Sequence, residues 1–351
     1  MNKIRLVQDD TETAPDAVLG EHPLVMAQAD KLGWRERMRM VLYILLGLTI
    51  LGFTGRVFWW ADYFAHPRLH LAFAITALGG LFFLMGDWLS MIAAAVGVLL
   101  NVMALSSAIN GANNTYNALA MPPGQLKVIT LNVGNINPTD SSFTQWLVGE
   151  QPDIVVLIEA NRAWLPQLDK LINALPYQKM ADHTTSYGIA ILSRFPMDKT
   201  ESSVAGPRSL PSLTAEMETP IGRIAVMGVH PNPPGDGADT HARDLYLAQL
   251  TAIAQTTSIP TLLAGDFNAT PWSSGFETIR LLPNLQPASL RIPSTWPASM
   301  GTMGLPTEHI LLSIPYDKPR AISFYDLTTG PSFSGTSHLP LIADIRVDTD
   351  E

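Results

Sequence analysis

The chain has 351 residues, of which 47% are hydrophobic and only 15% charged, and it contains no cysteine. The lack of cysteine excludes disulfides, thiolate metal sites and a cysteine nucleophile, and the net charge of −9 does not favour nonspecific binding to a polyanion. A composition this rich in apolar residues and this poor in charged residues indicates that part of the chain lies in a membrane.

The apolar residues are concentrated near the N-terminus. Residues 1–39 are polar, and we expect them to form a cytoplasmic segment. Three apolar runs follow at residues 40–55, 69–86 and 88–108. Each is about as long as a helix that crosses a bilayer, so residues 40–108 are predicted to form three transmembrane helices. A buried helical hairpin of a globular domain is the alternative.

Basic residues near the apolar runs predict the orientation. Lys31, Arg35, Arg37 and Arg39 precede the first run, whereas no Lys or Arg follows the third run before Lys127. Positive residues concentrate on the cytoplasmic side of membrane proteins. Three crossings then place everything after about residue 110 outside the cytoplasm, with residues 109–124 as a linker.

Residues 125–351 have the pattern of a separate domain. Short strand-like runs occur at residues 126–133, 154–158, 188–193, 223–230, 261–264, 309–313 and 339–347. Helices are expected at residues 141–150 and 240–256, the second with Thr240 as its N-cap. This order predicts two packed sheets flanked by helices, an α/β or α+β sandwich.

Polar side chains stand where several of these strands end. They are Asn132, Glu159, His230, Asp266, Asn268 and, just before the last strand, His338. A single acid after a strand is usually a turn former, but six such groups indicate a site at the rim of the sheets.

The residue types indicate metal-assisted phosphoester hydrolysis without a covalent nucleophile. A carboxylate such as Glu159 suits Mg²⁺, which polarises a phosphoryl oxygen. Asp266 could orient or deprotonate the attacking water. Asn132, Asn268 and His230 could hold phosphate oxygens, and His338 could exchange a proton.

The ordered words ITLNV, DIVVLIEA, GIAILSRFPM, GVHPNPP, GDFNATPWS and SHLPLIADI resemble the successive motifs of the endonuclease/exonuclease/phosphatase superfamily. The similarity is greatest to its bacterial branch with N-terminal membrane helices. The resemblance implies a four-layer α/β sandwich, Mg²⁺ or Mn²⁺ dependence, and a multi-pass protein of the bacterial inner membrane whose catalytic domain faces outside.

The resemblance also implies a role for each site residue. Glu159 is the metal ligand, and Asn132 supports the metal or phosphate. His230 and Asn268 contact the phosphate, Asp266 orients the water close to the metal, and His338 is the acid–base group. Arg194, in ILSRFP, is either a phosphate contact or a structural arginine.

The chain departs from the family pattern at two positions. Ser337 stands where the family usually has an Asp before the catalytic His, and Glu308 stands where an Asp orients that His. Two hypotheses remain open. One is a phosphodiesterase or nuclease acting on a phospholipid head group, a nucleic acid or a small phosphodiester. The other is a catalytically impaired phosphate-binding receptor or scaffold. Arg243 is expected on a solvated helix face.

Overall fold

The computed structural model describes residues 33–109, 125–134, 136–138, 140–282, 285–287, 293–315 and 322–347. The chain forms two compact units, Met1–Val41 and Leu42–Glu351. Helix α1 (Trp34–Leu51) begins in the first unit, and every other described element belongs to the second. Nearly all of the predicted linker, residues 109–124, lies outside the described residues, as do residues 1–32 of the N-terminal segment.

Each predicted apolar run corresponds to one helix. After α1 come the short 3₁₀ helix η1 (Trp59–Phe64), α2 (Arg68–Leu84) and α3 (Trp88–Ile109). Gly86 turns the chain between α2 and α3 with φ +68°, and the Asp87 carboxylate accepts hydrogen bonds from Ser90. Asn101 of α3 donates to Thr49 of α1 over 3.0 Å.

Only one of these described helices has both the length and the composition of a membrane span, Trp88–Ser106 in α3. Helix α2 is apolar but has 17 residues. Helix α1 carries Arg35, Glu36, Arg37 and Arg39 in its first six positions. The helices therefore match the predicted runs, while three spans of full length are not found among the described residues.

The second unit also contains two six-stranded sheets. The first has the order β11-β12-β1-β2-β4-β3 and the second β5-β6-β7-β8-β10-β9. Each contains one parallel pair, β1 with β2 and β7 with β8, and is otherwise antiparallel. The strands of the first sheet are β1 (Gln125–Asn132), β2 (Ile154–Ile158), β3 (Tyr177–Ala181), β4 (Ile189–Ser193), β11 (Ile322–Thr329) and β12 (Leu341–Val347). Those of the second are β5 (Met197–Ala205), β6 (Leu210–Thr219), β7 (Gly222–Val229), β8 (Thr261–Asp266), β9 (Leu285–Pro287) and β10 (Glu308–Ser313).

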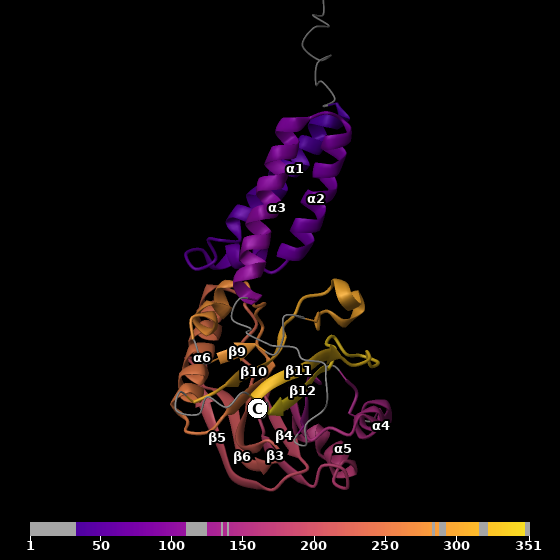
Figure 1. The fold of residues 1–351 in the computed structure, drawn as a ribbon. Helices are drawn as coiled ribbons and strands as arrows, with labels where there is room; N and C mark the ends of the chain where they lie inside the picture. Colours follow the sequence, from indigo (N-terminus) through magenta and orange to yellow (C-terminus); the bar gives the residue numbers. More distant parts are fainter. Residues whose placement is uncertain are drawn as a thin grey trace, which may run out of the picture. The chain divides into compact units, whose positions relative to one another are not determined.

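Helices cover the outer face of each sheet, as Figure 1 shows for α4 and α5 on one side and α6 on the other. They are α4 (Ser141–Glu150), η2 (Arg162–Trp164), α5 (Leu165–Lys170), α6 (Gly237–Thr256), η3 (Ser274–Phe276) and α7 (Glu277–Arg280). The 3₁₀ helix η4 (Ala298–Met303) lies in the segment between β9 and β10. One apolar cluster fills the space between the sheets, and two more lie between each sheet and its helices. The predicted α/β arrangement of two mixed sheets flanked by helices is confirmed.

Two local predictions need correction. Helix α6 starts at Gly237, and its N-cap is Asp236, whose carboxylate accepts from the Asp239 amide over 2.8 Å. Thr240 lies inside the helix and donates to the Asp236 carbonyl. Strands β3, β5, β6, β9 and β11 were not predicted. In β5 most side chains are exposed and polar, so no apolar pattern marks the strand.

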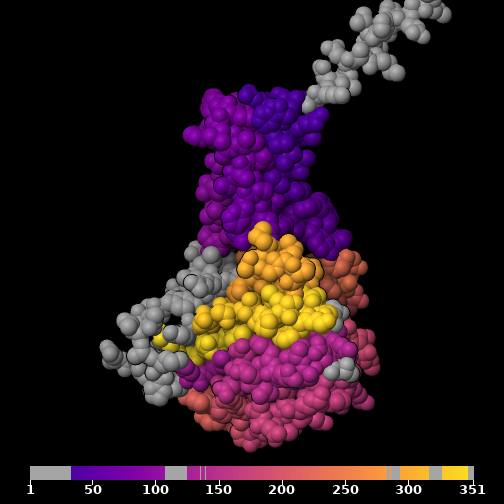
Figure 2. All heavy atoms as spheres, turned by 90° about the vertical axis from the view of Figure 1, so that its right-hand side faces the viewer, coloured from indigo at the N-terminus to yellow at the C-terminus, as the bar shows by residue number. Residues whose placement is uncertain are grey.

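The chain segment before His338 is anchored to α4. Phe333 meets Phe143 edge to face with ring centroids 5.5 Å apart and packs at 5.3 Å on Trp146. Figure 2 shows the yellow C-terminal segment lying directly against the magenta surface that includes α4. This packing fixes the loop that brings His338 back to the rim of the sheets.

Candidate active site

The ends of the two parallel strand pairs place four of the predicted side chains at one rim. Asn132 ends β1 and Glu159 follows β2, its neighbour in the first sheet. His230 follows β7 and Asp266 ends β8, its neighbour in the second sheet. Because the carboxyl ends of parallel neighbours lie at the same edge, two packed sheets bring all four side chains together.

Asn132 joins the two carboxylates across the sheets. Its Nδ2 donates to Glu159 Oε1 over 2.8 Å and to Asp266 Oδ2 over 3.1 Å. Its Oδ1 accepts from the Gly134 amide over 3.0 Å, which fixes the orientation of the side-chain amide. Burial raises the pKa of Glu159, but hydrogen bonds with His230 and Asn132 hold it below its usual value. Glu159 is therefore ionised at neutral pH.

The backbone at the end of β8 and in the turn that follows positions the Asp266 carboxylate. Gly265 has φ +153°, and a Cβ there would collide with the Val229 carbonyl oxygen of the neighbouring strand. Asp266 Oδ1 accepts from the Asn268 amide over 3.0 Å, and Asn268 itself has φ +49°. The Asn268 side chain donates to the Pro231 carbonyl over 3.0 Å, which ties this turn to the segment after β7.

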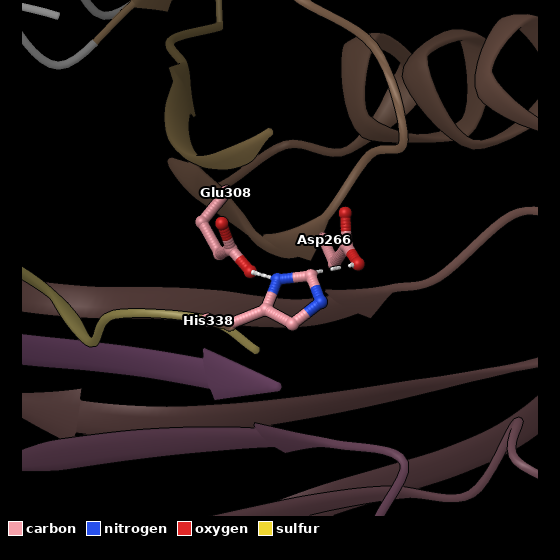
Figure 3. Close-up of side chains that lie close together, drawn as sticks. All are labelled: Asp266, Glu308 and His338. Carbon is pink, nitrogen blue, oxygen red and sulfur yellow. Dashed lines mark hydrogen bonds and ion pairs between the residues drawn. The ribbon is translucent and has the colours of Figure 1, made fainter. Parts of the chain in front are cut away.

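His338 and Glu308 form a buried pair, and Glu308 is the first residue of β10. His338 Nδ1 is hydrogen bonded to Glu308 Oε1, while Glu308 Oε2 accepts from Thr307 Oγ1 over 3.0 Å. Figure 3 shows Asp266 on the other side of the ring, and its Oδ2 lies 3.9 Å from Nδ1. Burial lowers the pKa of His338, but the charges of Glu308, Asp266 and Glu159 raise it to about 9. The imidazole is therefore protonated, and its second nitrogen faces away from Glu308.

His230 completes the cluster from the second sheet. Its Nε2 lies 3.6 Å from Glu159 Oε1, and its Nδ1 lies 3.4 Å from the Asp266 carbonyl oxygen. The Tyr187 ring packs on the imidazole with centroids 5.2 Å apart. Only 3% of His230 is exposed, so its ring is held in place by these contacts.

Most of the predicted site residues converge on one cavity of about 890 Å³. Asn132 and Glu308 lie behind its surface and do not line it. Its polar lining includes Glu159, His230, Asp266, Asn268 and His338. Its walls are largely apolar or aromatic, and they include Tyr63, Pro67, Pro233, Pro234, Tyr187, Trp296 and Leu305. The wall residues were not singled out from the sequence as cavity residues, because nothing in their local pattern distinguishes them from packing residues.

The sequence model of the endonuclease/exonuclease/phosphatase family matches residues 129–340, more than half of the chain. The chain belongs to this family. A search of curated protein sequences gave no significant match.

Solved structures of the family share the fold. An endonuclease/exonuclease/phosphatase from Beutenbergia cavernae is 16% identical, with a TM-score of 0.53 over 64% of this chain and 72% of that one. D. rerio TDP2, solved with a single-strand DNA product, is also 16% identical, with a TM-score of 0.53 over 63% and 99%. A functionally unknown protein from Enterococcus faecalis has a TM-score of 0.52 at 16% identity, over 64% of this chain and all of that one.

The donor set of this family member suits a hard divalent cation. Glu159 and Asp266 offer carboxylate oxygens separated only by the Asn132 amide. Asp266, Glu308 and His338 also present ligand atoms within 4.8 Å of one another. His338 Nδ1 is already hydrogen bonded to Glu308, whereas Asn132 holds the carboxylates of Glu159 and Asp266 side by side, so the oxygens of Glu159 and Asp266 fit the cation better.

Two arginines lie elsewhere than the sequence suggested. Arg194 follows β4, which is antiparallel to β2, and pairs with Asp153 at the opposite end of β2 from Glu159, over 3.2 Å. The structure does not bring Arg194 to the site, and its pairing with Asp153 agrees with the alternative of a structural arginine. Arg243 is fully buried and not on a solvated face. It donates to Asp62 over 3.0 Å and to the Asn268 carbonyl over 3.2 Å.

Asp62, which pairs with Arg243, was not predicted from the sequence, although its position gave a signal. Asp62 is the only acid between Glu36 and Asp87, in the most apolar part of the chain. It is 2% exposed, and it accepts from the Ser274 amide over 2.8 Å as well as from Arg243. Nearby, His66 Nδ1 lies 3.1 Å from Thr270 Oγ1, and Trp272 Nε1 donates to the His66 carbonyl over 2.9 Å. The segment between α1 and α2 is thereby bound to the turn that carries Asn268.

Proposed function

We propose that the protein is a divalent-metal-dependent phosphodiesterase, anchored in a bacterial inner membrane by its N-terminal helices, with the catalytic domain outside the cytoplasm. The observation that carries this proposal is the convergence of Glu159, His230, Asp266, Asn268 and His338 on one cavity. Ionised carboxylates, amides and a protonated imidazole together provide what hydrolysis of a phosphoester needs.

Glu159 and Asp266, with Asn132 between them, would hold Mg²⁺ or Mn²⁺. The metal, when bound, would neutralise the charge that develops on the phosphoryl oxygens. Asp266 would orient a water for attack on phosphorus, opposite the ester oxygen that leaves. The water oxygen would form the new bond to phosphorus as the old phosphorus–oxygen bond breaks, and the Asp266 carboxylate would accept the proton that the water loses.

The raised pKa of His338 suits it to the leaving oxygen. A protonated imidazole can donate its Nε2 proton to the departing alkoxide, and Glu308 holds the ring in the required orientation. His230, and Asn268 through its backbone turn or its side chain, would contact the phosphate oxygens. Glu308 thus supplies the hydrogen bond expected from an Asp at this position.

A phosphate-binding domain without catalysis is the second candidate, and Ser337 is the observation that favours it. Serine cannot supply the charge of the Asp that usually precedes the catalytic His. The ionised Glu159 and the Glu308–His338 pair support retention of catalysis.

Contacts of the segment between α1 and α2 support the predicted topology. Asp62 and His66 bind Arg243 and Thr270 of the catalytic domain, so this segment and the domain must lie on the same side of any membrane. Three membrane crossings would place them on the same side, because the segment between α1 and α2 follows the first crossing and the catalytic domain follows the third. Only 28% of the apolar window in α3 is buried, which favours insertion over a buried hairpin.

The walls of the cavity favour a lipid phosphoester among the three substrate classes. Tyr63 and Pro67 come from the connection next to α2, and Trp296 and Leu305 add to the same apolar surface. Residues 121–351 carry 14 Lys and Arg against 22 Asp and Glu. That excess of acid opposes binding of a long nucleic acid, which depends on neutralising phosphates.

The test uses the full-length chain in detergent, because residues 63–67 form part of the cavity wall. Hydrolysis of bis-p-nitrophenyl phosphate, single-stranded DNA and phospholipid would be measured with Mg²⁺, Mn²⁺ and EDTA. We expect metal-dependent hydrolysis that disappears in Asp266→Ala and His338→Ala. A folded protein without activity on any substrate with either metal would support the phosphate-binding alternative.

A further inference from the structure

A second cavity, of about 280 Å³, lies next to the helices and shares no lining residue with the catalytic cavity. Phe53, Arg56 and Arg68 line it from the end of α1 and the beginning of α2. Ser274, Glu277 and Arg280 line it from η3 and α7. Its volume is several times the roughly 30 Å³ that one water molecule occupies in the liquid.

Arg68 is the unusual residue of this cavity. The side chain is 1% exposed, and its Nε and one terminal nitrogen have no hydrogen-bond partner among the described residues. The ring of Phe53 covers the guanidinium at 3.8 Å from the ring centroid. A cation–π contact stabilises the charge but accepts none of its in-plane N–H groups. A buried guanidinium without an anionic partner is costly, so an anion is expected beside it.

The neighbouring carboxylates attract Arg68 but form no hydrogen bond with its Nε or its unpartnered terminal nitrogen among the described residues. Among these carboxylates Asp62 attracts Arg68 most strongly, and it is already paired with Arg243. Glu277 pairs with Arg56 over 2.9 Å. Arg280 donates to the carbonyl oxygens of Pro271 and Ser273, which are neutral. Burial lowers the pKa of Arg280, as expected for a cation held away from water. The lining therefore has three arginines and one carboxylate, and the buried Ser274 hydroxyl also has no partner among the described residues.

We propose that this cavity binds a phosphate group, offered either by the head group of an anionic membrane lipid or by free phosphate. Guanidinium N–H groups and a hydroxyl are the donors that match phosphate oxygens. The cavity lies where α1 ends and α2 begins, which is the level of lipid head groups if these helices enter a membrane. The site does not depend on hydrolysis in the other cavity.

The first test measures thermal unfolding of the full-length protein in detergent, in EDTA, with increasing inorganic phosphate. We expect the Tm to rise by about 5–10 °C at roughly 100 times the Kd. Arg68→Met keeps an apolar stem over Phe53 and removes the charge. Without phosphate its Tm should equal or exceed that of the wild type, and phosphate should leave it unchanged.

Matched variants separate this site from nonspecific effects. Ser274→Ala removes one donor and should reduce the shift without changing the fold. Arg223→Met, at an exposed arginine paired with Asp198 and Glu216, should keep the whole shift. Retention of the full shift in both Arg68→Met and Ser274→Ala would assign phosphate to another place and overturn the proposal. A Tm of Arg68→Met far below the wild type without phosphate would also overturn it.

The second test identifies the source of the phosphate group. Nanodiscs of phosphatidylglycerol and of phosphatidylcholine would be compared, with the wild type and Arg68→Met in each. A phosphatidylglycerol-dependent rise in Tm, lost in Arg68→Met, assigns the site to an anionic lipid even if inorganic phosphate has no effect. If neither inorganic phosphate nor phosphatidylglycerol raises the Tm of the wild type, the cavity does not bind phosphate.

Discussion

Two buried ion pairs beside the Asp266–Asn268 turn, Arg243–Asp62 and His338–Glu308, differ in how many of their donor nitrogens are used within the protein. Arg243 is fully buried, and its nitrogens are used by Asp62, Asp244 and the Asn268 carbonyl. The His338 side chain is 12% exposed and gives only Nδ1 to Glu308, so its second nitrogen is left for the cavity. A pair whose donors are all used within the protein holds structure, whereas a pair with a free donor facing a cavity can act on a substrate.

His66 and His338 both lie beside carboxylates, but their pKa values are shifted in opposite directions. Burial, opposed in part by the nearby Asp62, lowers the pKa of His66 to about 4. The charge of Asp62 is already balanced by Arg243, which also disfavours a protonated His66. His338 has three carboxylates near it, and its pKa rises to about 9. The proton on an imidazole is thus decided by the whole group of neighbouring charges.

The largest expected effect is on catalysis. His338→Gln removes the proton donor, and kcat should fall by about 10²–10⁴-fold. His241→Gln, at an exposed position on α6, is the matched control and should retain full activity. Steady-state hydrolysis of a phospholipid with Mg²⁺ measures both, because its alkoxide leaving group needs the proton that His338 would donate. Unchanged kcat in a folded His338→Gln protein would remove His338 from the reaction.

The next effect is on stability. Arg243→Met leaves Asp62 buried without its cation, so the free energy of unfolding should fall by about 3–5 kcal/mol. Arg223→Met breaks only exposed pairs and should cost about 1 kcal/mol or less. Denaturant unfolding in detergent measures both variants. Equal losses in the two would show that burial of the Asp62–Arg243 pair makes no difference.

Glu308→Gln should alter the pH dependence of activity. Without the Glu308 charge, the pKa of His338 should move from about 9 toward 6.5. The protonated form, which donates the proton, is lost as pH rises through the pKa. The high-pH limb of kcat/KM should therefore move to lower pH, with a loss of roughly tenfold at about pH 8. A limb at the same pH in wild type and variant would contradict the proposed pairing.

The smallest effect concerns His66. Its folded pKa of about 4 is below the unfolded value of 6.5, so the unfolded chain binds the extra proton. The stabilisation that comes from this pKa difference of His66 is fully present above about pH 6.5 and is lost progressively as pH falls toward 4. His66→Asn keeps an atom near Thr270 that can hydrogen bond and should remove about 1 kcal/mol of that loss at about pH 5.5. Tm measured against pH for both proteins tests this, and parallel curves would show that His66 is not the group responsible.

Much of the site could be predicted from the sequence because its residues follow buried strands. The runs before Asn132, Glu159, His230 and Asp266 are apolar enough to be recognised, and the residue after each run was visible. The family motifs added His338 and its partner Glu308. Exposed polar strands such as β5 were missed because nothing in their composition distinguishes them from loops.

The sequence by itself determined the buried apolar strands, the apolar N-terminal helices, the family and the polar groups at the strand ends, since each depends on neighbours along the chain. Only the tertiary structure decided that Arg194 stays at the far end of β2, that Arg243 is buried against Asp62, and that Arg68 lies in a second cavity. Arg194 and Asp153 are 41 residues apart, Arg243 and Asp62 are 181 apart, and Arg68 precedes Ser274, which lines the same cavity, by more than 200 residues. A charge at one position in a sequence carries no mark of which distant charge folding will bring beside it.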